Sequence, residues 1–360
     1  MSIFETTSPE APEAPEASAS LGEGDGEVAA EATGTKMSKK RKGAIAGLVI
    51  ALVILAFLFI WYLMNRKPLS ELPGLSSTTM PHYELSIYGT TQPVGVAANA
   101  SGDRIYVTES GGTNLVRVYD RDGKPAGTLK PPKSTGASHI PVYVAINPTT
   151  QDVYVSDRAT ASIYVYSENG TYLRTFAPKG DLGGKWNPLG LAFAPDGTLY
   201  ATDVRPLPVK SHRVLAFAPD GALTRSIGTP GQLNFPNGIV VDSQGNIEVS
   251  DSNNGRLVVF SQFGKMLATI SPGIGEGDLG LPRGVAVDDA GRLYVVDTAD
   301  HMVRVYVIDK SKAMPTYIGS FGGEGQLDAT FEYPNGVATD KRAHIYVTDR
   351  ENNRVQVWGY

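Results

Sequence analysis

Arginine, asparagine and tyrosine side chains occur where a repeated phrase of this sequence varies most. Six of these side chains form a candidate binding site: Tyr143, Arg158, Asn237, Arg283, Asn335 and Arg350. Guanidinium groups make paired, charge-assisted hydrogen bonds with carboxylates and phosphates, and arginine and tyrosine are common at binding hot spots. The set therefore indicates recognition of a carboxylate, a phosphate or an acidic peptide. The alternative is that these are ordinary solvated loop residues.

Carboxylates recur once in every repeat and are a second candidate for chemistry. They are Glu109, Asp157, Asp203, Asp251, Asp297 and Asp349. A ring of carboxylates could bind a metal ion, but acidic side chains at turns more often accept backbone N–H groups. We expect the structural role, with some of these groups paired to Arg213, Arg256 or Arg354 on the following strand.

Few residues are candidates for metal binding or for nucleophilic catalysis. The chain has no cysteine, which excludes disulfides and thiolate sites. A zinc site needs converging ligands, yet the five histidines fall at different points of the repeat: His82, His139, His212, His301 and His344. A calcium site built at one position of the repeat would use Asn237 and Asn335, but the equivalent positions hold Val94, Val142, Leu189 and Arg283. We identify no catalytic residue, metal ligand or cofactor.

Short strands within a repeat must position these groups. A phrase of proline, any residue and usually glycine, followed by an apolar strand, a turn and a second strand, recurs at 46- to 52-residue spacing, typical of a four-stranded blade. Its prolines are Pro93, Pro141, Pro188, Pro236, Pro282 and Pro334. The strands are rich in Val, Ile, Tyr and Phe and end at Gly, Asp or Asn turns. The pattern predicts an all-β, six-bladed β-propeller over residues 83–360, closed radially.

The last repeat carries the clearest family signature. Residues 334–358 read PNGVATDKRAHIYVTDRENNRVQVW and resemble the NHL repeat. The first two repeats match more loosely, because Leu115 and Ser162 stand where Arg354 stands and Tyr143 replaces the usual glycine. The resemblance implies a propeller. It implies no single activity, because NHL propellers serve as binding platforms, lyases and signalling modules.

One strand is expected to close the ring. The chain ends at Tyr360 after the third strand of the sixth repeat, and residues 83–89 (YELSIYG) look like the fourth strands at 171–176 and 316–321. We expect residues 83–89 to complete the sixth blade.

The N-terminal region predicts a membrane anchor. Residues 1–42 form an acidic tail that ends in a basic cluster, and its low apolar content predicts disorder. Residues 43–64 are uncharged and long enough to span about 30 Å of hydrocarbon, and they end in Trp61 and Tyr62 rather than at a cleavage site. The basic cluster predicts a cytoplasmic N-terminus. Residues 65–82 would be a tether.

These features together predict a membrane-tethered, extracytoplasmic propeller that binds or scaffolds protein or peptide partners. The alternative is an enzyme, a metal-dependent hydrolase or lyase of lactonase-like or amidating-lyase-like type that acts over the channel. The net charge of −5 and the absence of a basic footprint argue against nucleic acid. Nothing in the sequence fixes an oligomeric state.

Overall fold

The computed structural model describes residues 47–57, 80–132, 138–205, 211–273, 275–309 and 311–360. Two units divide the chain, residues 1–58 and 59–360. In the first unit, residues 47–57 form a helix. Within the described ranges, no helix is long and apolar enough to span a membrane. The predicted span at 43–64 extends past this helix on both sides, so the rest of it lies outside the described residues, as do the acidic tail 1–42 and residues 65–79 of the tether.

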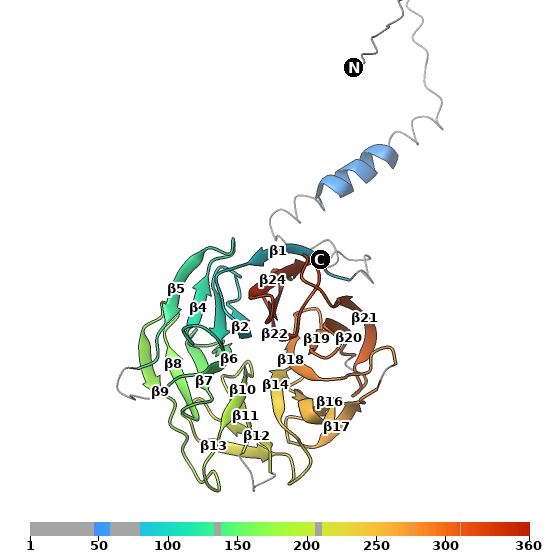
Figure 1. Cartoon of the computed structure of the whole chain (residues 1–360). Helices are drawn as coiled ribbons and strands as arrows, with labels where there is room; N and C mark the ends of the chain where they lie inside the picture. The colour runs from blue at the N-terminus through green and yellow to red at the C-terminus, as the bar shows by residue number, and fades with distance from the viewer. Residues whose placement is uncertain (1–46, 58–79, 133–137, 206–210, 274, 310) are drawn as a thin grey trace, which may run out of the picture. The chain divides into compact units, whose positions relative to one another are not determined.

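Residues 80–360 form six four-stranded antiparallel sheets arranged as the blades of a propeller (Figure 1). Blade 1 is β2 (Pro93–Ala98), β3 (Ile105–Glu109), β4 (Val116–Tyr119) and β5 (Pro125–Leu129). Blade 2 is β6 (Pro141–Ile146), β7 (Val153–Asp157), β8 (Ser162–Tyr166) and β9 (Tyr172–Thr175). Blade 3 is β10 (Pro188–Phe193), β11 (Leu199–Asp203), β12 (Arg213–Phe217) and β13 (Leu223–Ile227).

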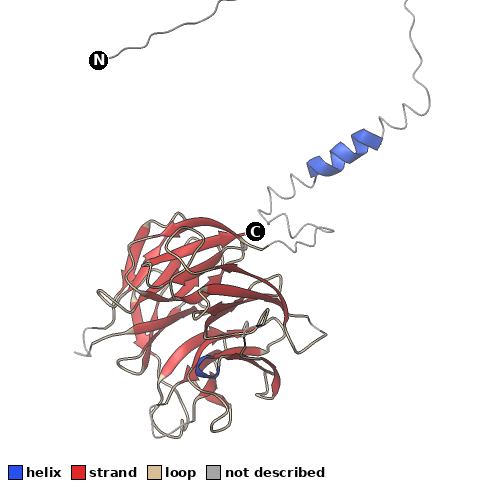
Figure 2. Cartoon of the chain, turned by 45° about the vertical axis from the view of Figure 1, so that its right-hand side comes forward, coloured by secondary structure: helices blue, strands red, loops and turns tan. Residues whose placement is uncertain are grey.

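The second half of the ring repeats this order. Blade 4 is β14 (Pro236–Val241), β15 (Ile247–Asp251), β16 (Arg256–Phe260) and β17 (Met266–Ile270), with the 3-10 helix η3 (Ser252–Asn254) between β15 and β16 (Figure 2). Blade 5 is β18 (Pro282–Val287), β19 (Arg292–Asp297), β20 (Met302–Val307) and β21 (Thr316–Gly322). Blade 6 is β22 (Pro334–Thr339), β23 (Ile345–Asp349), β24 (Arg354–Gly359) and β1 (His82–Ile87). The prediction of an all-β, six-bladed propeller is confirmed.

Blade 6 combines strands from both ends of the propeller. β1 pairs antiparallel with β24, from His82 opposite Gly359 to Ile87 opposite Val355. The rings of Tyr83 and Trp358 meet edge to face across this pair. Residues 83–87 of the segment 83–89 that was expected to close the ring thus lie in β1, the fourth strand of the sixth sheet, and residues 88 and 89 follow it.

The inner strands β2, β6, β10, β14, β18 and β22 surround the axis (Figure 1). They pack so closely that the glycine of the Pro-X-Gly phrase is required. A Cβ atom on Gly190 would lie 2.0 Å from the carbonyl oxygen of Asn237, and one on Gly238 would lie 2.2 Å from that of Arg283. Each glycine therefore fixes where the inner strand of the next blade begins.

Hydroxyl groups tie neighbouring blades together at the same level. Thr108 Oγ1 donates to the Val142 carbonyl at 2.7 Å, and Ser156 Oγ donates to the Leu189 carbonyl at 2.6 Å. Thr348 Oγ1 donates to the Val94 carbonyl at 2.9 Å and so joins blade 6 to blade 1. These bonds hold the backbone of Val94, Val142 and Leu189, each of which follows a recurring proline and faces the axis.

A tyrosine recurs in the second strand of five blades and is buried: Tyr106, Tyr154, Tyr200, Tyr294 and Tyr346. Blade 4 has Glu248 at this position, opposite Val240, and only 1% of the residue is exposed. Burial, followed by the nearby Asp242 carboxylate, raises the pKa of Glu248 well above its usual 4.5. The sequence analysis did not anticipate a buried acid here.

Candidate functional site

A pocket of about 390 Å³ opens on the propeller axis. All six blades contribute to it through the residue after each recurring proline: Val94, Val142, Leu189, Asn237, Arg283 and Asn335. The wall above this ring comes from residues just before a proline or just after a recurring carboxylate: Ser110, Ile140, Arg158, Phe235, Leu281, Thr298, Tyr333 and Arg350. Five of the six predicted binding residues thus line one pocket, and Tyr143 is the exception.

The ring at the base of the pocket has two chemically different arcs. Blades 1 to 3 contribute Val94, Val142 and Leu189, which form an apolar arc. Blades 4 to 6 contribute Asn237, Arg283 and Asn335, which form a polar arc. Because the blades follow one another around the axis, each arc is continuous, and a ligand would meet an apolar surface on one side and hydrogen-bonding groups on the other.

Arg283 is the central cation of the polar arc. Its Nη1 donates to Asn237 Oδ1 at 3.3 Å, while its buried Nε has no hydrogen-bond partner among the described residues. Asn237 is held in turn, because its Nδ2 donates to Ser252 Oγ at 2.7 Å. Within the described part of the chain, no carboxylate pairs with Arg283, so its guanidinium retains donors for a ligand.

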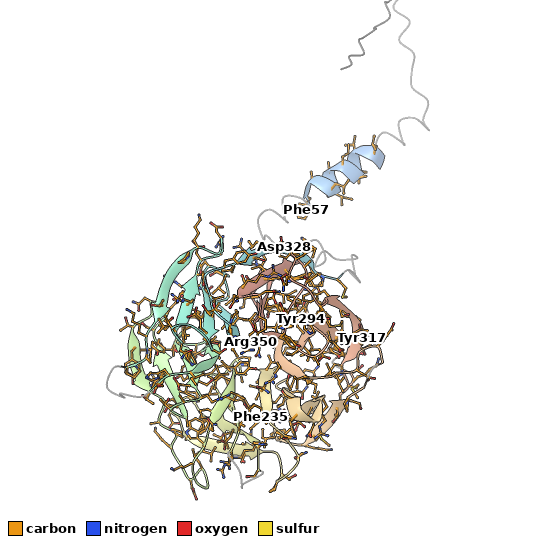
Figure 3. All side chains as sticks on the ribbon, in the orientation of Figure 1. Phe57, Phe235, Tyr294, Tyr317, Asp328 and Arg350 are labelled. Atoms are coloured by element: carbon orange, nitrogen blue, oxygen red, sulfur yellow. The ribbon has the colours of Figure 1, made fainter. Side chains whose placement is uncertain are left out.

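Two further arginines stand on the wall. The side chain of Arg158 is exposed and makes no hydrogen bond or ion pair with any described residue. Arg350, labelled near the middle of the ring in Figure 3, forms an ion pair with Glu351, which offsets part of its charge. The described lining contains three guanidinium groups and no carboxylate. Such a cleft concentrates anions.

Tyr143 lies deeper on the axis than the other predicted residues. It is 8% exposed and packs against Leu189 and Val204, and its hydroxyl donates to Asn335 Oδ1 at 3.5 Å. Burial raises the pKa of Tyr143, although Arg283 acts in the opposite direction, so the phenol stays neutral. Tyr143 lines a separate cavity of about 40 Å³ at the level of Gly238, Gly284 and Gly336. It therefore fills channel space that glycine leaves open in the other blades.

The recurring carboxylates have the structural role that the sequence predicted. All six are at most 1% exposed: Glu109, Asp157, Asp203, Asp251, Asp297 and Asp349. Asp251 is typical, because its Oδ1 accepts the Asn234 N–H at 2.6 Å and its Oδ2 accepts Arg256 Nε at 2.7 Å. The predicted pairings of Arg213 with Asp203 and of Arg354 with Asp349 are also present. These bonds fix the loops that carry the pocket wall.

Two aromatic residues of the wall were missed by the sequence analysis. Phe235 and Tyr333 directly precede recurring prolines and have φ values of 55° and 49°, a strained region for aromatic residues. In these blades the buried carboxylate accepts the N–H two residues before the proline, from Asn234 or Glu332, as Glu109 does from Thr91 in blade 1. Tyr333 instead donates its N–H to His301 Nδ1 at 3.2 Å. An aromatic residue before the proline, found only in these two repeats, was the available signal.

The histidines do not converge. His139 Nδ1 lies 2.9 Å from Asp157 Oδ2 and occupies the place that arginine takes in other blades. His344 Nδ1 lies 2.9 Å from Asp340 Oδ2, and its Nε2 lies 3.7 Å from Glu84 Oε2 on β1. Within the described ranges, no group of three His, Cys, Asp or Glu residues is arranged to hold a metal ion.

The fold and the axial pocket define a β-propeller with a single continuous ring of blades. The chain carries NHL repeats, matched at residues 233–260, 279–306 and 331–358. It is thus an NHL-repeat, six-bladed β-propeller. No curated protein sequence matches the chain.

Several solved structures share the fold. A streptogramin B lyase superposes with a TM-score of 0.55 at 12% identity, covering 79% of this chain and 99% of that one. Virginiamycin B lyase from Staphylococcus aureus gives a TM-score of 0.53 at 13% identity, covering 78% and 99%. A protein of unknown function from Bacteroides thetaiotaomicron gives 0.56 at 18%, covering 78% and 72%. At these identities the likeness concerns the fold alone.

Proposed function

We propose that this chain is a membrane-tethered, extracytoplasmic binding propeller that captures an anionic group of a protein or peptide partner in its axial pocket. The observation that carries the proposal is the convergence of Arg158, Arg283 and Arg350, from three different blades, on one pocket whose described lining has no carboxylate. The repeat brings equivalent positions of every blade to this surface, and the support for a ligand is that three of these positions carry guanidinium groups while none in the described lining carries a carboxylate.

The free donors of Arg283 support a ligand at this place. Its Nη1 donates to Asn237 Oδ1, and its Nη2 makes no hydrogen bond with any described residue. A bound carboxylate or phosphate would accept from these terminal groups in the paired bonds that guanidinium groups favour.

The membrane tether and the extracytoplasmic position rest on the N-terminal sequence. The uncharged run 43–64 is preceded by five basic residues within 36–42, a distribution that favours a cytoplasmic N-terminus. A propeller placed in this way would present its pocket to partners in the cell envelope or outside it.

Cross-linking in cells followed by affinity capture and mass spectrometry tests the proposal. Three forms of the full chain are compared: wild type, an R158A/R283A/R350A triple variant, and a control, R121A/R225A/R342A, that removes the same charge outside the pocket lining. We expect a partner to be captured by wild type and by the control and to be lost with the pocket variant, with all three forms melting at similar temperatures. Equal capture by all three would refute the proposed site.

A further inference from the structure

We propose, on the basis of the proposed binding function, that the axial pocket recognises the free C-terminus of a peptide whose last residue is apolar. The polar arc would bind the terminal carboxylate, and the apolar arc would take the last side chain. This names the partner chemistry of the same site and is tested separately below.

The first reason is that the pocket ends blindly. The open volume on the axis decreases from about 390 Å³ in the pocket to about 40 Å³ in the cavity at the next level of the inner strands. That level is lined by apolar side chains such as Val96, Leu191 and Ile239, together with the phenol of Tyr143. An internal peptide segment would have to pass through or turn back, whereas a chain end fits a closed pocket.

The second reason is the placement of free donors. Arg283 Nη2 makes no hydrogen bond with the described residues. Asn335 uses its Oδ1 to accept the Tyr143 hydroxyl, and its Nδ2 makes no hydrogen bond with the described residues. Tyr143 thus orients the amide so that its NH₂ group remains available. A carboxylate needs two or more donors at one spot, and capture of a terminal carboxylate by convergent donors is a known mode of peptide recognition.

The third reason is the apolar arc opposite these donors. Val94, Val142 and Leu189 offer only aliphatic surface at the same level as Arg283. An inorganic anion or a phosphate would leave this arc in contact with water or with charge. An α-carboxylate that carries an apolar side chain on the same carbon matches both arcs at once, because burial of apolar area is favourable.

The mouth of the pocket suits the residues that precede a C-terminus. Tyr333 is 50% exposed at the rim, and its left-handed backbone is held by the bond to His301. Arg158 and Arg350 stand at the same level of the wall. A rigid aromatic edge with flanking cations can hold the peptide backbone and any acidic side chain upstream. The volume falls in the roughly 300–1,000 Å³ range of small-ligand pockets, so the site holds a chain end and not a long segment.

Fluorescence anisotropy with the detergent-solubilised full chain tests this inference. The probe is a pool of N-terminally labelled hexapeptides with five random positions and a C-terminal leucine, prepared as free acid and as C-terminal amide. We expect the amide pool to bind about 10- to 100-fold more weakly, the range of charge-assisted hydrogen bonds. Replacing the last leucine by aspartate should also weaken binding, because a second charge would then face the apolar arc.

Variants and competitors decide between the sources of the carboxylate. R283Q should abolish the difference between acid and amide, whereas the control R121Q should keep it. Retention of the difference in a folded R283Q protein would overturn the assignment of the polar arc. Free leucine that competes as well as the peptide would also overturn the inference, since a small carboxylate would then be sufficient.

The failure of this inference is distinguishable from failure of the proposed function. Amidated hexapeptides with internal aspartate or glutamate that bind as tightly as free acids, and that lose binding in R283Q, would overturn C-terminal recognition and leave anion capture standing. Absence of binding by every anionic peptide would overturn both.

Discussion

Glu248 makes the stability of blade 4 depend on pH, and the substitution E248Q tests this dependence. The glutamate stands where five other blades have a buried tyrosine, and its Oε2 has no partner among the described residues. Burial and the neighbouring Asp242 raise its pKa well above 4.5. The folded protein therefore retains a proton at a pH where the unfolded chain has released it.

The sign and size of the effect follow from proton linkage. Because the folded-state pKa is raised, the stabilising protonated form is fully present below pH 4.5 and its contribution is lost as the pH rises toward the folded pKa. Over that interval, the free energy of unfolding falls by up to about 1.4 kcal/mol per pH unit relative to a non-titrating side chain. Glutamine keeps the shape and a donor toward Asp242 but does not titrate. The free energy of unfolding of E248Q should therefore rise relative to that of wild type as the pH rises.

Urea unfolding between pH 4.5 and pH 8 measures the difference directly. The same experiment on E276Q, an exposed glutamate, controls for the loss of one acid elsewhere. We expect the difference between E248Q and wild type to grow with pH and the difference between E276Q and wild type to stay flat. A pH-independent difference for E248Q would refute the reasoning, because it would mean that Glu248 is equally ionised in the folded and unfolded states.

Three further predictions concern the ring itself. The hydrogen bond to Asp340 raises the pKa of His344 and outweighs burial, which acts in the opposite direction. H344Q should therefore lose stability relative to wild type below pH 6.5 and approach it as the pH rises through the folded pKa, as thermal melts at pH 5.5 and 9 will show. G238A should cost about 1–3 kcal/mol, because the new Cβ would lie 2.2 Å from the Arg283 carbonyl oxygen; an unchanged urea midpoint would contradict the close approach of blades 4 and 5. Deletion of residues 83–89 removes most of β1 and leaves β24 as an edge, so the melting temperature or the solubility should collapse; an unaltered melt would show that β1 does not hold the ring shut.

The sequence predicted the fold well because each residue that recurs in the repeat has the same structural role in nearly every blade. Each Pro-X-Gly phrase marks an inner strand whose glycine allows the next blade to approach. Each recurring aspartate accepts a backbone N–H from the loop before the proline, as Asp251 does from Asn234. The same regularity places any variable residue at a known level of the axis. Arg158, Arg283 and Arg350 could therefore be grouped before their contacts were seen.

The features that the sequence analysis missed are set by single residues that depart from the repeat. Glu248 replaces a tyrosine, and only the packing of the neighbouring strands shows that its carboxyl group is buried. Phe235 and Tyr333 place an aromatic ring at the wall position just before the proline, where Ile140 and Leu281 stand in other blades. Tyr143 was grouped with the rim residues, but a side chain in a glycine position fills the channel below. The membrane span at 43–64 and the tether at 65–82 stay predictions.

Photo-cross-linking from the pocket rim tests the central claim most directly. Tyr333 is 50% exposed at the pocket, and Tyr172, 37% exposed on β9, is a matched control outside the pocket lining. Each is replaced by p-benzoylphenylalanine in the full chain, with and without R283A, and adducts are identified after irradiation of cells. We predict a protein or peptide adduct at position 333 that disappears with R283A and does not form at position 172. Equal adducts at both positions, or adducts at 333 that persist in R283A, would contradict anion capture in the axial pocket.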